Sequence, residues 1–264
     1  MLIICNGVFK SGSSWLHSIV IEILREHNLL LSIVDEKYTN NINSPTTIIE
    51  SNLIEFISKE DYKKNNYITK SHYHKIDTLS RKYDKNVKFI FIDRDIKDAI
   101  ISHYHHFKNK FSLKISFSSY YFFIGRLKAY EIYLFNQRYI KFFGKECFVS
   151  YEDLKEEFSR TVLKICHILG LPELTIKQIE KIEKETSIDS LRKKIKKGEI
   201  KYYSTVKKEK WRMIRKGRVG DWKYFYSLKQ NLSIQDIIDG KASLFTKLTY
   251  YIFFTLRRKL GSVE

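Results

Sequence analysis

The sequence predicts an α/β protein with a P-loop-like central parallel sheet flanked by helices, in a single domain, and three observations support this class. A buried apolar run at residues 2–5 and 8–9 leads into a polar turn that contains a glycine. Residues 15–27 then show the apolar spacing of an amphipathic helix. A second apolar run, at residues 87–92, also ends in charged residues before a helical segment. Strands that alternate with helices in this way indicate a parallel sheet with ligands at its strand ends.

The remaining segments continue this alternation. Residues 67–69 and 147–150 predict two short strands. Three further helices are predicted, at residues 96–107, at residues 119–143, and after the last strand as far as Leu169. Residues 108–118 are expected to form a mobile loop between the first two of these helices.

The composition indicates a folded and strongly basic protein. Hydrophobic residues make up 43% of the 264 residues, which excludes a disordered chain. The chain has 48 Lys and Arg against 30 Asp and Glu, and its formal net charge is +18. A field of this sign favours an anionic partner, which includes nucleic acid, an anionic membrane, and a phosphate- or sulfate-bearing ligand. We find no recognised nucleic-acid motif, so we expect no nucleic-acid partner.

The cysteines and the apolar segments predict a cytoplasmic protein. Cys5, Cys147 and Cys166 are odd in number and widely spaced, which argues against a disulfide framework and a zinc ribbon. The N-terminal segment lacks a basic leader and a cleavage site. No stretch reaches the about 18 apolar residues that span a bilayer.

We predict one domain over residues 1–239 and an aromatic and basic tail over residues 240–264. Apolar residues recur in the tail near helical spacing, at Phe245, Leu248, Tyr251, Ile252 and Leu256. Such a stripe most often packs on the protein's own core. The alternative is peripheral contact with a membrane surface.

The first turn carries residue types that bind anions. It consists of Lys10, Ser11, Gly12, Ser13, Ser14 and Trp15. Backbone N–H groups at such a turn converge on an anion, and the N-terminus of the following helix adds a favourable dipole. The lysine adds a positive charge and the serines add hydroxyl donors. The turn lacks the GxxxxGK[ST] pattern of a Walker A loop, and an ordinary turn with serine caps is the alternative.

The second long strand leads to a further candidate phosphate site. Arg94 follows this strand, and Ser102 lies eight residues later on the predicted helix. An arginine fork and a serine hydroxyl can together hold a phosphate, and a solvated Asp-Arg-Asp turn is the alternative. The helix also carries three histidines whose spacing does not suit a closed metal site: His103, His105 and His106.

Six segments in this order resemble the motifs of cytosolic-type sulfotransferases, and together they span residues 9–223. They are KSGSSW at 10–15, ITKSH at 68–72, RDIKDAIISHYHHF at 94–107, FVSYEDL at 148–154, TSI at 186–188 and RKGRVGDWK at 215–223. The resemblance implies transfer of a sulfuryl group from 3′-phosphoadenosine 5′-phosphosulfate (PAPS) to an acceptor hydroxyl. The acceptor could be a small molecule, a glycan or a lipid.

The resemblance also implies the roles of individual residues. His72 is expected to be the general base, Lys10 to stabilise the leaving oxygen, and Lys70 to lie by the sulfuryl oxygens. The residues expected at the 3′-phosphate are Arg94, Ser102, Arg215, Lys216 and Gly217. Further nucleotide contacts are expected from Lys10, Ser11, Gly12, Ser13, Ser14, Trp15, Tyr151, Thr186 and Ile188. Lysines would replace the Mg²⁺ of phosphoryl transfer, so no metal is expected.

Two departures from the family pattern leave questions open. Ile188 replaces an aromatic residue, which would weaken stacking on the adenine. Residues 223–232 lack the terminal acid of the family's dimer segment, so the oligomeric state is open. Residues 37–66 and 108–121 are expected to line the acceptor site. The aromatic residues 120–123 are either an apolar wall of that site or part of a packed core.

Two other functions are consistent with the same features. The first is a P-loop-like small-molecule kinase that uses ATP. The second is a non-enzymatic binder of polyanions through the basic residues 192–218. Preference for the adenosine bisphosphate over ATP without Mg²⁺ would exclude the first, and nucleotide binding itself would argue against the second.

Overall fold

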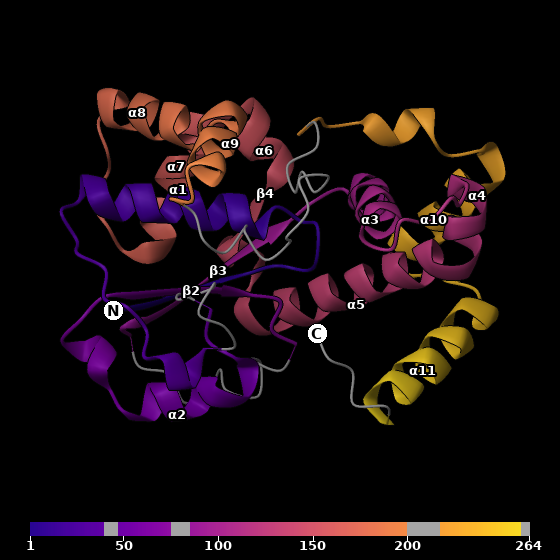
Figure 1. The fold of residues 1–264 in the computed structure, drawn as a ribbon, viewed down its shortest axis with the longest axis horizontal. Helices are drawn as coiled ribbons and strands as arrows, with labels where there is room; N and C mark the ends of the chain where they lie inside the picture. The colour runs from indigo at the N-terminus through magenta and orange to yellow at the C-terminus, as the bar shows by residue number, and fades with distance from the viewer. Residues whose placement is uncertain (40–46, 75–84, 200–216, 260–264) are drawn as a thin grey trace. The chain divides into compact units, whose positions relative to one another are not determined.

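The computed structural model describes residues 1–39, 47–74, 85–199 and 217–259. The chain forms two compact units (Figure 1). The first unit consists of Met1–Arg94 and Tyr139–Gly217, and the second of Asp95–Arg138 and Arg218–Glu264. The predicted boundary after residue 239 is not tested by this division and stays a prediction.

The first unit is built on a four-stranded parallel sheet, as predicted. Its strands are β1 (Leu2–Asn6), β2 (Tyr67–Ser71), β3 (Val87–Asp93) and β4 (Phe148–Ser150), in the order β2-β1-β3-β4. Leu2 pairs with Tyr67 on one side and with Val87 on the other, so these strands run in step. Because all pairs are parallel, the carboxyl ends of the strands meet at one edge of the sheet.

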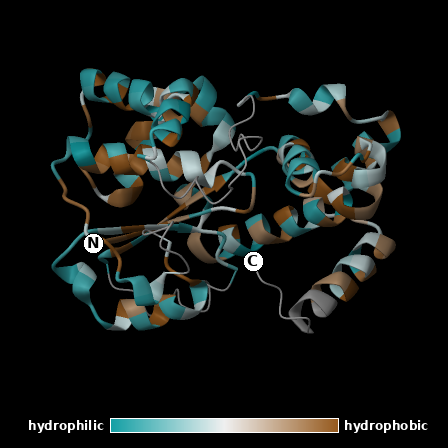
Figure 2. Ribbon diagram, viewed as in Figure 1, coloured by the Kyte–Doolittle hydropathy of each residue, from teal (hydrophilic) through white to brown (hydrophobic). Residues whose placement is uncertain are grey.

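The helices of this unit cover both faces of the sheet (Figure 1). They are α1 (Ser13–Glu26), α2 (Leu53–Ser58), α6 (Tyr151–Glu156), α7 (Phe158–Leu169), α8 (Ile176–Thr186) and α9 (Ile188–Lys196). Helices α1 and α7 bury apolar side chains against the strands, among them Ile19, Ile23 and Ile165. On the other face, the rings of Tyr139 and Phe143 pack against Phe91. Figure 2 shows the strands mostly in the hydrophobic colour, as expected for a sheet covered on both faces.

The first predicted strand is shorter than expected. Strand β1 ends at Asn6, and Val8 is buried in the turn that follows rather than in the strand. Strand β2 is longer than expected, because it continues through Lys70 to Ser71. Polar residues at a strand end thus take part in the ladder where the neighbouring strand offers backbone partners.

The second unit is helical. Its elements are α3 (Ile96–Lys110), α4 (Phe117–Tyr120), the π-helical turn η5 (Tyr121–Gly125), the greater part of α5 (Arg126–Phe143), the 3₁₀ turn η8 (Asp221–Tyr224), α10 (Leu228–Ile238) and α11 (Leu244–Lys259). Asp95 caps α3 by accepting from the backbone N–H groups of Lys97 and Asp98. The buried Asp98 carboxylate accepts from the backbone N–H groups of Gly220 and Trp222, at 2.6 and 2.9 Å. This pair of bonds anchors the segment that carries the Gly-Asp-Trp motif to α3.

Four predictions for the second unit need correction. The expected single helix 119–143 is divided by η5, and the expected loop 108–118 covers only the residues between α3 and α4. Residues 120 and 121 are buried, whereas Phe122 and Phe123 are exposed, so the four aromatic residues do not form one wall. Packing of the tail stripe on the protein's own core is wrong, because Phe245, Leu248 and Ile252 on α11 are more than half exposed.

No helix in the described part of the chain is long and apolar enough to cross a membrane.

Truncation of the α1 core side chain tests the packing of the first unit. Ile19 has no exposed surface, whereas Ile33 is 82% exposed. We expect Ile19→Ala to lower the free energy of unfolding by about 2–5 kcal/mol, because it leaves a cavity between α1 and the sheet. Ile33→Ala is the matched control and should change it by less than about 0.5 kcal/mol. Urea unfolding followed by circular dichroism measures both, and equal effects would contradict the packing described.

Candidate active site

The turn after β1 is held tightly against β3. A β-carbon on Gly7 would lie 2.6 Å from the Ser11 hydroxyl oxygen and 2.9 Å from the carbonyl oxygen of Ile92. Gly12 has a φ of 102°, and a β-carbon there would lie 2.7 Å from the ring of Tyr151. Larger residues are therefore excluded at both ends of the turn. This close approach brings the end of β1 to the end of β3.

The turn is shaped by its own hydrogen bonds. The Ser11 hydroxyl donates to the carbonyl of Val8 at 2.7 Å, and the Ser11 backbone N–H also reaches that oxygen at 3.2 Å. Helix α1 begins at Ser13 with Gly12 as its N-cap, and no side-chain cap bond is present there. The alternative of an ordinary turn with serine caps is therefore not supported. The first N–H groups of α1 remain suited to an anion.

Two lysines add positive charge at this edge of the sheet. Lys10 lies in the turn, with its backbone in the left-handed region at a φ of 63°. Burial lowers the pKa of Lys10 to about 8, and the positive charges of Arg94 and Lys70 lower it further in the same direction. Burial likewise lowers the pKa of Lys70 to about 8. A group of half-buried cations that repel one another is stabilised by an anion.

His72 follows β2 and faces the same turn. Its ring Nδ1 lies 2.5 Å from the carbonyl oxygen of Gly7. Because a carbonyl only accepts, Nδ1 carries the proton and donates, which leaves the lone pair on Nε2. Burial lowers the pKa of His72 to about 3, and the Lys70 charge contributes in the same direction. This pKa is well below the near-neutral value of a free histidine, so the imidazole is neutral.

The backbone that follows His72 is fixed by buried hydrogen bonds. The Asn6 side chain accepts from the backbone N–H of Tyr73 at 3.0 Å and donates to its carbonyl at 3.2 Å. The Tyr139 hydroxyl donates to the same carbonyl at 2.8 Å. Sequence analysis missed Asn6 and Tyr139. A polar residue that ends an apolar strand is the signal for the first, and nothing local marks the second.

Arg94 and Tyr151 connect this turn to the end of β4. The Arg94 guanidinium donates to the carbonyl of Lys10 at 3.5 Å. Its central carbon lies 4.2 Å from the centre of the Tyr151 ring, which is a cation–π contact. Ser150 caps α6, so Tyr151 begins that helix, and its ring meets Trp15 edge-on at 5.3 Å. The aromatic ring of Tyr151 thus lies between the arginine and the tryptophan.

Trp15 links α1 to the junction of α8 and α9. Its indole N–H donates to the carbonyl of Thr186 at 3.0 Å. The Lys155 ammonium lies 4.8 Å from the centre of the indole ring. Sequence analysis missed Lys155, although its position four residues after Tyr151 places both on one face of α6. The Thr186 hydroxyl donates to the carbonyl of Ile182 at 2.8 Å, within its own helix.

Ile188 begins α9 and lies against Gly217. A β-carbon on Gly217 would lie 2.3 Å from the Ile188 Cδ1 and 3.5 Å from the Tyr151 hydroxyl. Gly217 has a φ of 63°, so it also needs the conformational freedom of glycine. Ile188, Gly217 and Tyr151 therefore lie close together.

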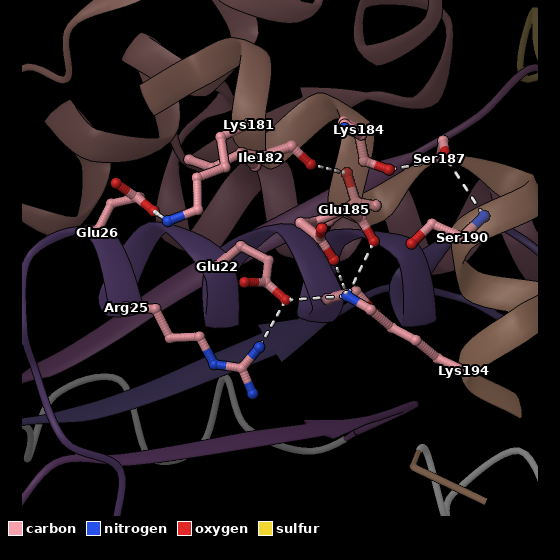
Figure 3. Close-up of polar contacts among 12 residues, drawn as sticks. Glu22, Arg25, Glu26, Lys181, Ile182, Lys184, Glu185, Ser187, Ser190 and Lys194 are labelled. Carbon is pink, nitrogen blue, oxygen red and sulfur yellow. Dashed lines mark hydrogen bonds and ion pairs between the residues drawn. The ribbon is translucent and has the colours of Figure 1, made fainter. Parts of the chain in front are cut away.

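The junction of α8 and α9 is fixed to α1 by charged contacts (Figure 3). The Lys194 ammonium from α9 reaches Glu22 of α1 at 3.4 Å and the Glu185 carboxylate of α8 at 2.8 Å. It also donates to the backbone carbonyl of Glu185 at 3.1 Å, where the helix dipole favours a cation. Lys181 of α8 forms a second pair with Glu26 of α1 at 2.7 Å. These contacts position the Thr186 carbonyl that accepts from Trp15.

The first unit contains most of the predicted site. Contacts connect Lys10 to Arg94, Arg94 to Tyr151, and Tyr151 to Trp15. Ser13 is buried at the start of α1, and Ser14 is partly exposed beside it. Ser102 belongs to the second unit, where it is half-buried on α3. Arg215 and Lys216 lie outside the described residues.

The predicted histidine cluster on α3 makes local contacts. His103 Nδ1 lies 2.6 Å from the Tyr120 hydroxyl, and the ring of His105 meets that of Phe225 edge-on. Among the described residues, no group of three or more His, Cys, Asp or Glu side chains is placed to hold a metal ion.

Comparison with known families assigns the chain. The family model described as the sulfotransferase domain matches residues 2–247. This match covers most of the chain and runs through both units. The chain therefore belongs to the sulfotransferase domain family, which confirms the predicted resemblance.

Several curated proteins are similar in sequence. Cytosolic sulfotransferase 1 of Danio rerio is 32% identical over 97 residues, which are 36% of this chain and 31% of that protein. Sulfotransferase 1C2 of Rattus norvegicus is 28% identical over 181 residues, covering 60% and 56%. Flavonol 4′-sulfotransferase of Flaveria chlorifolia is 26% identical over 260 residues, covering 89% and 77%. The chain thus spans about a third and about half of the length of the first two relatives.

Solved structures share the fold. A crystal structure of mouse sulfotransferase SULT7A1 complexed with PAP superposes with a TM-score of 0.65 and 18% identity, over 94% of this chain and 87% of that one. Retinol dehydratase in complex with androsterone and PAP gives a TM-score of 0.60 and 14% identity, over 91% and 80%. The predicted α/β fold with a parallel central sheet is confirmed.

Removal of the Lys194 ammonium tests the junction of α8 and α9. We expect Lys194→Met to lower the free energy of unfolding by about 1–2 kcal/mol, because two ion pairs and a bond to a carbonyl are lost while the apolar stem remains. Lys181→Met, on α8, is the matched control, because its ammonium also pairs with a glutamate of α1. It should have a clearly smaller effect, because that ammonium is largely solvated. Urea unfolding measures both, and a control effect as large as that of Lys194→Met would refute the role given to Lys194.

Proposed function

We propose that the protein transfers the sulfuryl group of PAPS to the hydroxyl of an acceptor. The observation that carries this proposal is the grouping of Lys10, Lys70 and Arg94 with the neutral His72 at one sheet edge, in a chain of the sulfotransferase domain family. In the reaction, the bond between the sulfur and the bridging phosphate oxygen breaks. A bond forms between the sulfur and the acceptor oxygen, and the acceptor proton moves to His72.

His72 is proposed as the general base. Its donated bond to Gly7 leaves Nε2 unprotonated and fixes the ring orientation. In the free protein the pKa of His72 is lowered by burial and, in part, by the charges of Lys70 and Lys10. A bound anionic donor neutralises these charges, so the basicity of the imidazole rises when the donor is present. This coupling favours proton transfer only in the complete complex.

The lysines and the start of α1 are proposed to hold the 5′-phosphosulfate. Lys10 stabilises the leaving phosphate oxygen, and Lys70 compensates charge on the sulfuryl oxygens. Backbone N–H groups of Gly12, Ser13 and Ser14 add donors at the turn. The two lysines supply the positive charge that Mg²⁺ supplies in phosphoryl transfer, so the proposed reaction uses no metal.

The rest of the nucleotide is proposed to lie along the aromatic residues. Trp15 and Tyr151, with Thr186 and Ile188, form the contacts to the base and ribose. The 3′-phosphate is assigned to Arg94, Ser102, Arg215, Lys216 and Gly217 by the resemblance to the family. The family match favours sulfuryl transfer over the ATP-dependent kinase and over a simple polyanion binder.

A small-molecule alcohol or phenol is proposed as the acceptor. The names of similar proteins mention flavonols, and solved structures hold androsterone or retinol. The alternative acceptor is a sugar or lipid hydroxyl, and a screen of acceptors must distinguish it from a small alcohol or phenol. A cytoplasmic location and peripheral membrane contact of the tail also stay predictions.

Substitution of His72 tests the proposed base. His72→Gln can keep the bond to the Gly7 carbonyl but removes the base, and His72→Ala removes both. We expect both variants to lose about 100-fold or more in sulfuryl transfer, while the affinity for 3′-phosphoadenosine 5′-phosphate (PAP) changes little. Labelled PAPS with a panel of phenols, sterols, sugars and glycolipids measures transfer, and calorimetry without Mg²⁺ measures PAP binding.

The control for this experiment is His167→Ala, which removes an exposed histidine of α7. It should leave transfer unchanged. Near-normal transfer by His72→Gln would eliminate His72 as the base. Failure of the unmodified protein to bind PAP would refute the proposed donor.

The lowered lysine pKa values predict a pH dependence of PAP binding. Lys10 and Lys70 have pKa values of about 8, so they lose their protons as the pH rises through that value. Since the anion binds the protonated form, affinity should fall by about tenfold or more between pH 7 and 9.5. Lys10→Arg keeps its charge at pH 9.5 and should reduce this dependence. A flat profile for the unmodified protein, measured by calorimetry, would contradict the prediction.

A further inference from the structure

Large apolar side chains lie on the surface of the second unit, along α11. Leu244, Phe245, Leu248 and Ile252 are 71%, 60%, 53% and 62% exposed. At 100° per residue these four positions fall within one stripe of the helix. Thr246, on the opposite side, is buried, and Tyr250 one turn later meets the ring of the buried Tyr130 edge-on at 5.3 Å, so that side of the helix faces the unit and the stripe faces outward. Figure 2 shows hydrophobic colour along this helix.

The exposed aromatic residues of η5 continue this surface. Phe122 and Phe123 are more than half exposed. The guanidinium of Arg126 lies 5.3 Å from the Phe122 ring and 4.3 Å from the Phe245 ring. The two rings therefore lie on neighbouring parts of one surface. We call it the apolar patch, and it consists of Phe122, Phe123, Leu244, Phe245, Leu248 and Ile252.

The charge around the patch indicates what covers it. The tail, residues 240–264, contains one acidic residue, Glu264, and five basic ones: Lys241, Lys247, Arg257, Arg258 and Lys259. A second copy of the chain would bring the same positive charge to the contact and be repelled. An anionic surface is complementary to this positive charge. A surface that also has an apolar layer beneath its anionic groups matches both the basic residues and the apolar stripe of α11.

We propose that the apolar patch docks on the interfacial region of an anionic lipid bilayer. The stripe of α11 and the two phenylalanine rings of η5 enter the boundary between headgroups and acyl chains. The Lys241 and Lys247 ammonium groups interact with the anionic headgroups. Docking is peripheral, in keeping with the finding that none of the described helices is long and apolar enough to span a bilayer. The proposal does not depend on the proposed sulfuryl transfer.

Vesicle co-sedimentation of the full chain tests this docking. Vesicles of phosphatidylcholine with about a third phosphatidylserine are expected to bind the protein, and pure phosphatidylcholine vesicles to bind it more weakly. The double variant Leu248→Asp/Ile252→Asp should lower binding by about tenfold or more, because it removes two inserted side chains and adds two negative charges. Phe123→Asp on η5 probes the patch from a separate element and should weaken binding as well.

The matched control places the same two charges on the first unit. Leu30 and Ile33 are 88% and 82% exposed, so Leu30→Asp/Ile33→Asp makes an equivalent change away from the patch. It should bind the vesicles nearly as the unmodified protein does. Circular dichroism and the affinity for PAP should be unchanged in all variants, which separates loss of docking from loss of the fold or of the nucleotide site.

Three results would overturn the proposal. The first is absence of binding to the anionic vesicles. The second is equal loss of binding in the patch variants and the control. The third is a concentration-dependent dimer, seen by sedimentation velocity, that the patch variants dissociate. That result would assign the patch to a second copy instead.

Discussion

The site depends on the position of one residue without a side chain. Gly7 lies so close to Ile92 that no β-carbon fits between them, and its carbonyl oxygen accepts from His72. One peptide unit thus connects the ends of β1, β2 and β3. Lys10 and Arg94 are neighbours because these strand ends are. In a parallel sheet, this is the edge where polar groups can converge without breaking the ladder.

This convergence is electrostatically unfavourable in the free protein. Burial and mutual repulsion lower the pKa of Lys10, and burial does the same for Lys70. The same charges, together with burial, keep His72 neutral. The fold tolerates this arrangement because the residues around it are tightly connected, by the hydrogen bonds of Asn6 and Tyr139 and by the stacking of Arg94 on Tyr151. The clustering of buried cations at this edge therefore lowers the stability of the free protein and at the same time favours the binding of an anion.

Much of this arrangement could be predicted from the sequence, for a physical reason. Apolar runs that stop at Lys10, Lys70 and Arg94 mark strand ends, and parallel strand ends must lie together. What could not be predicted depends on contacts distant in sequence. The bond of Trp15 to Thr186 and the support of Tyr73 by Tyr139 leave no local pattern. Local periodicity also gave no sign of η5, because a π-helical turn keeps the composition of the helix it interrupts.

The apolar stripe of α11 shows a different limit. Its spacing correctly predicted a helix, but spacing does not say which side of a helix the protein covers. The expectation that this stripe faces the core was wrong, because the inward side of α11 carries Thr246 and Tyr250 instead. Periodicity identifies a face and leaves its partner undetermined.

The contact between Ile188 and Gly217 has a consequence for protein engineering. The terminal methyl of Ile188 occupies the space that a β-carbon at position 217 would need, and the φ of 63° at Gly217 disfavours any other residue there. Shortening residue 188 would remove the steric conflict but not the backbone strain, so position 217 favours glycine whichever residue stands at 188.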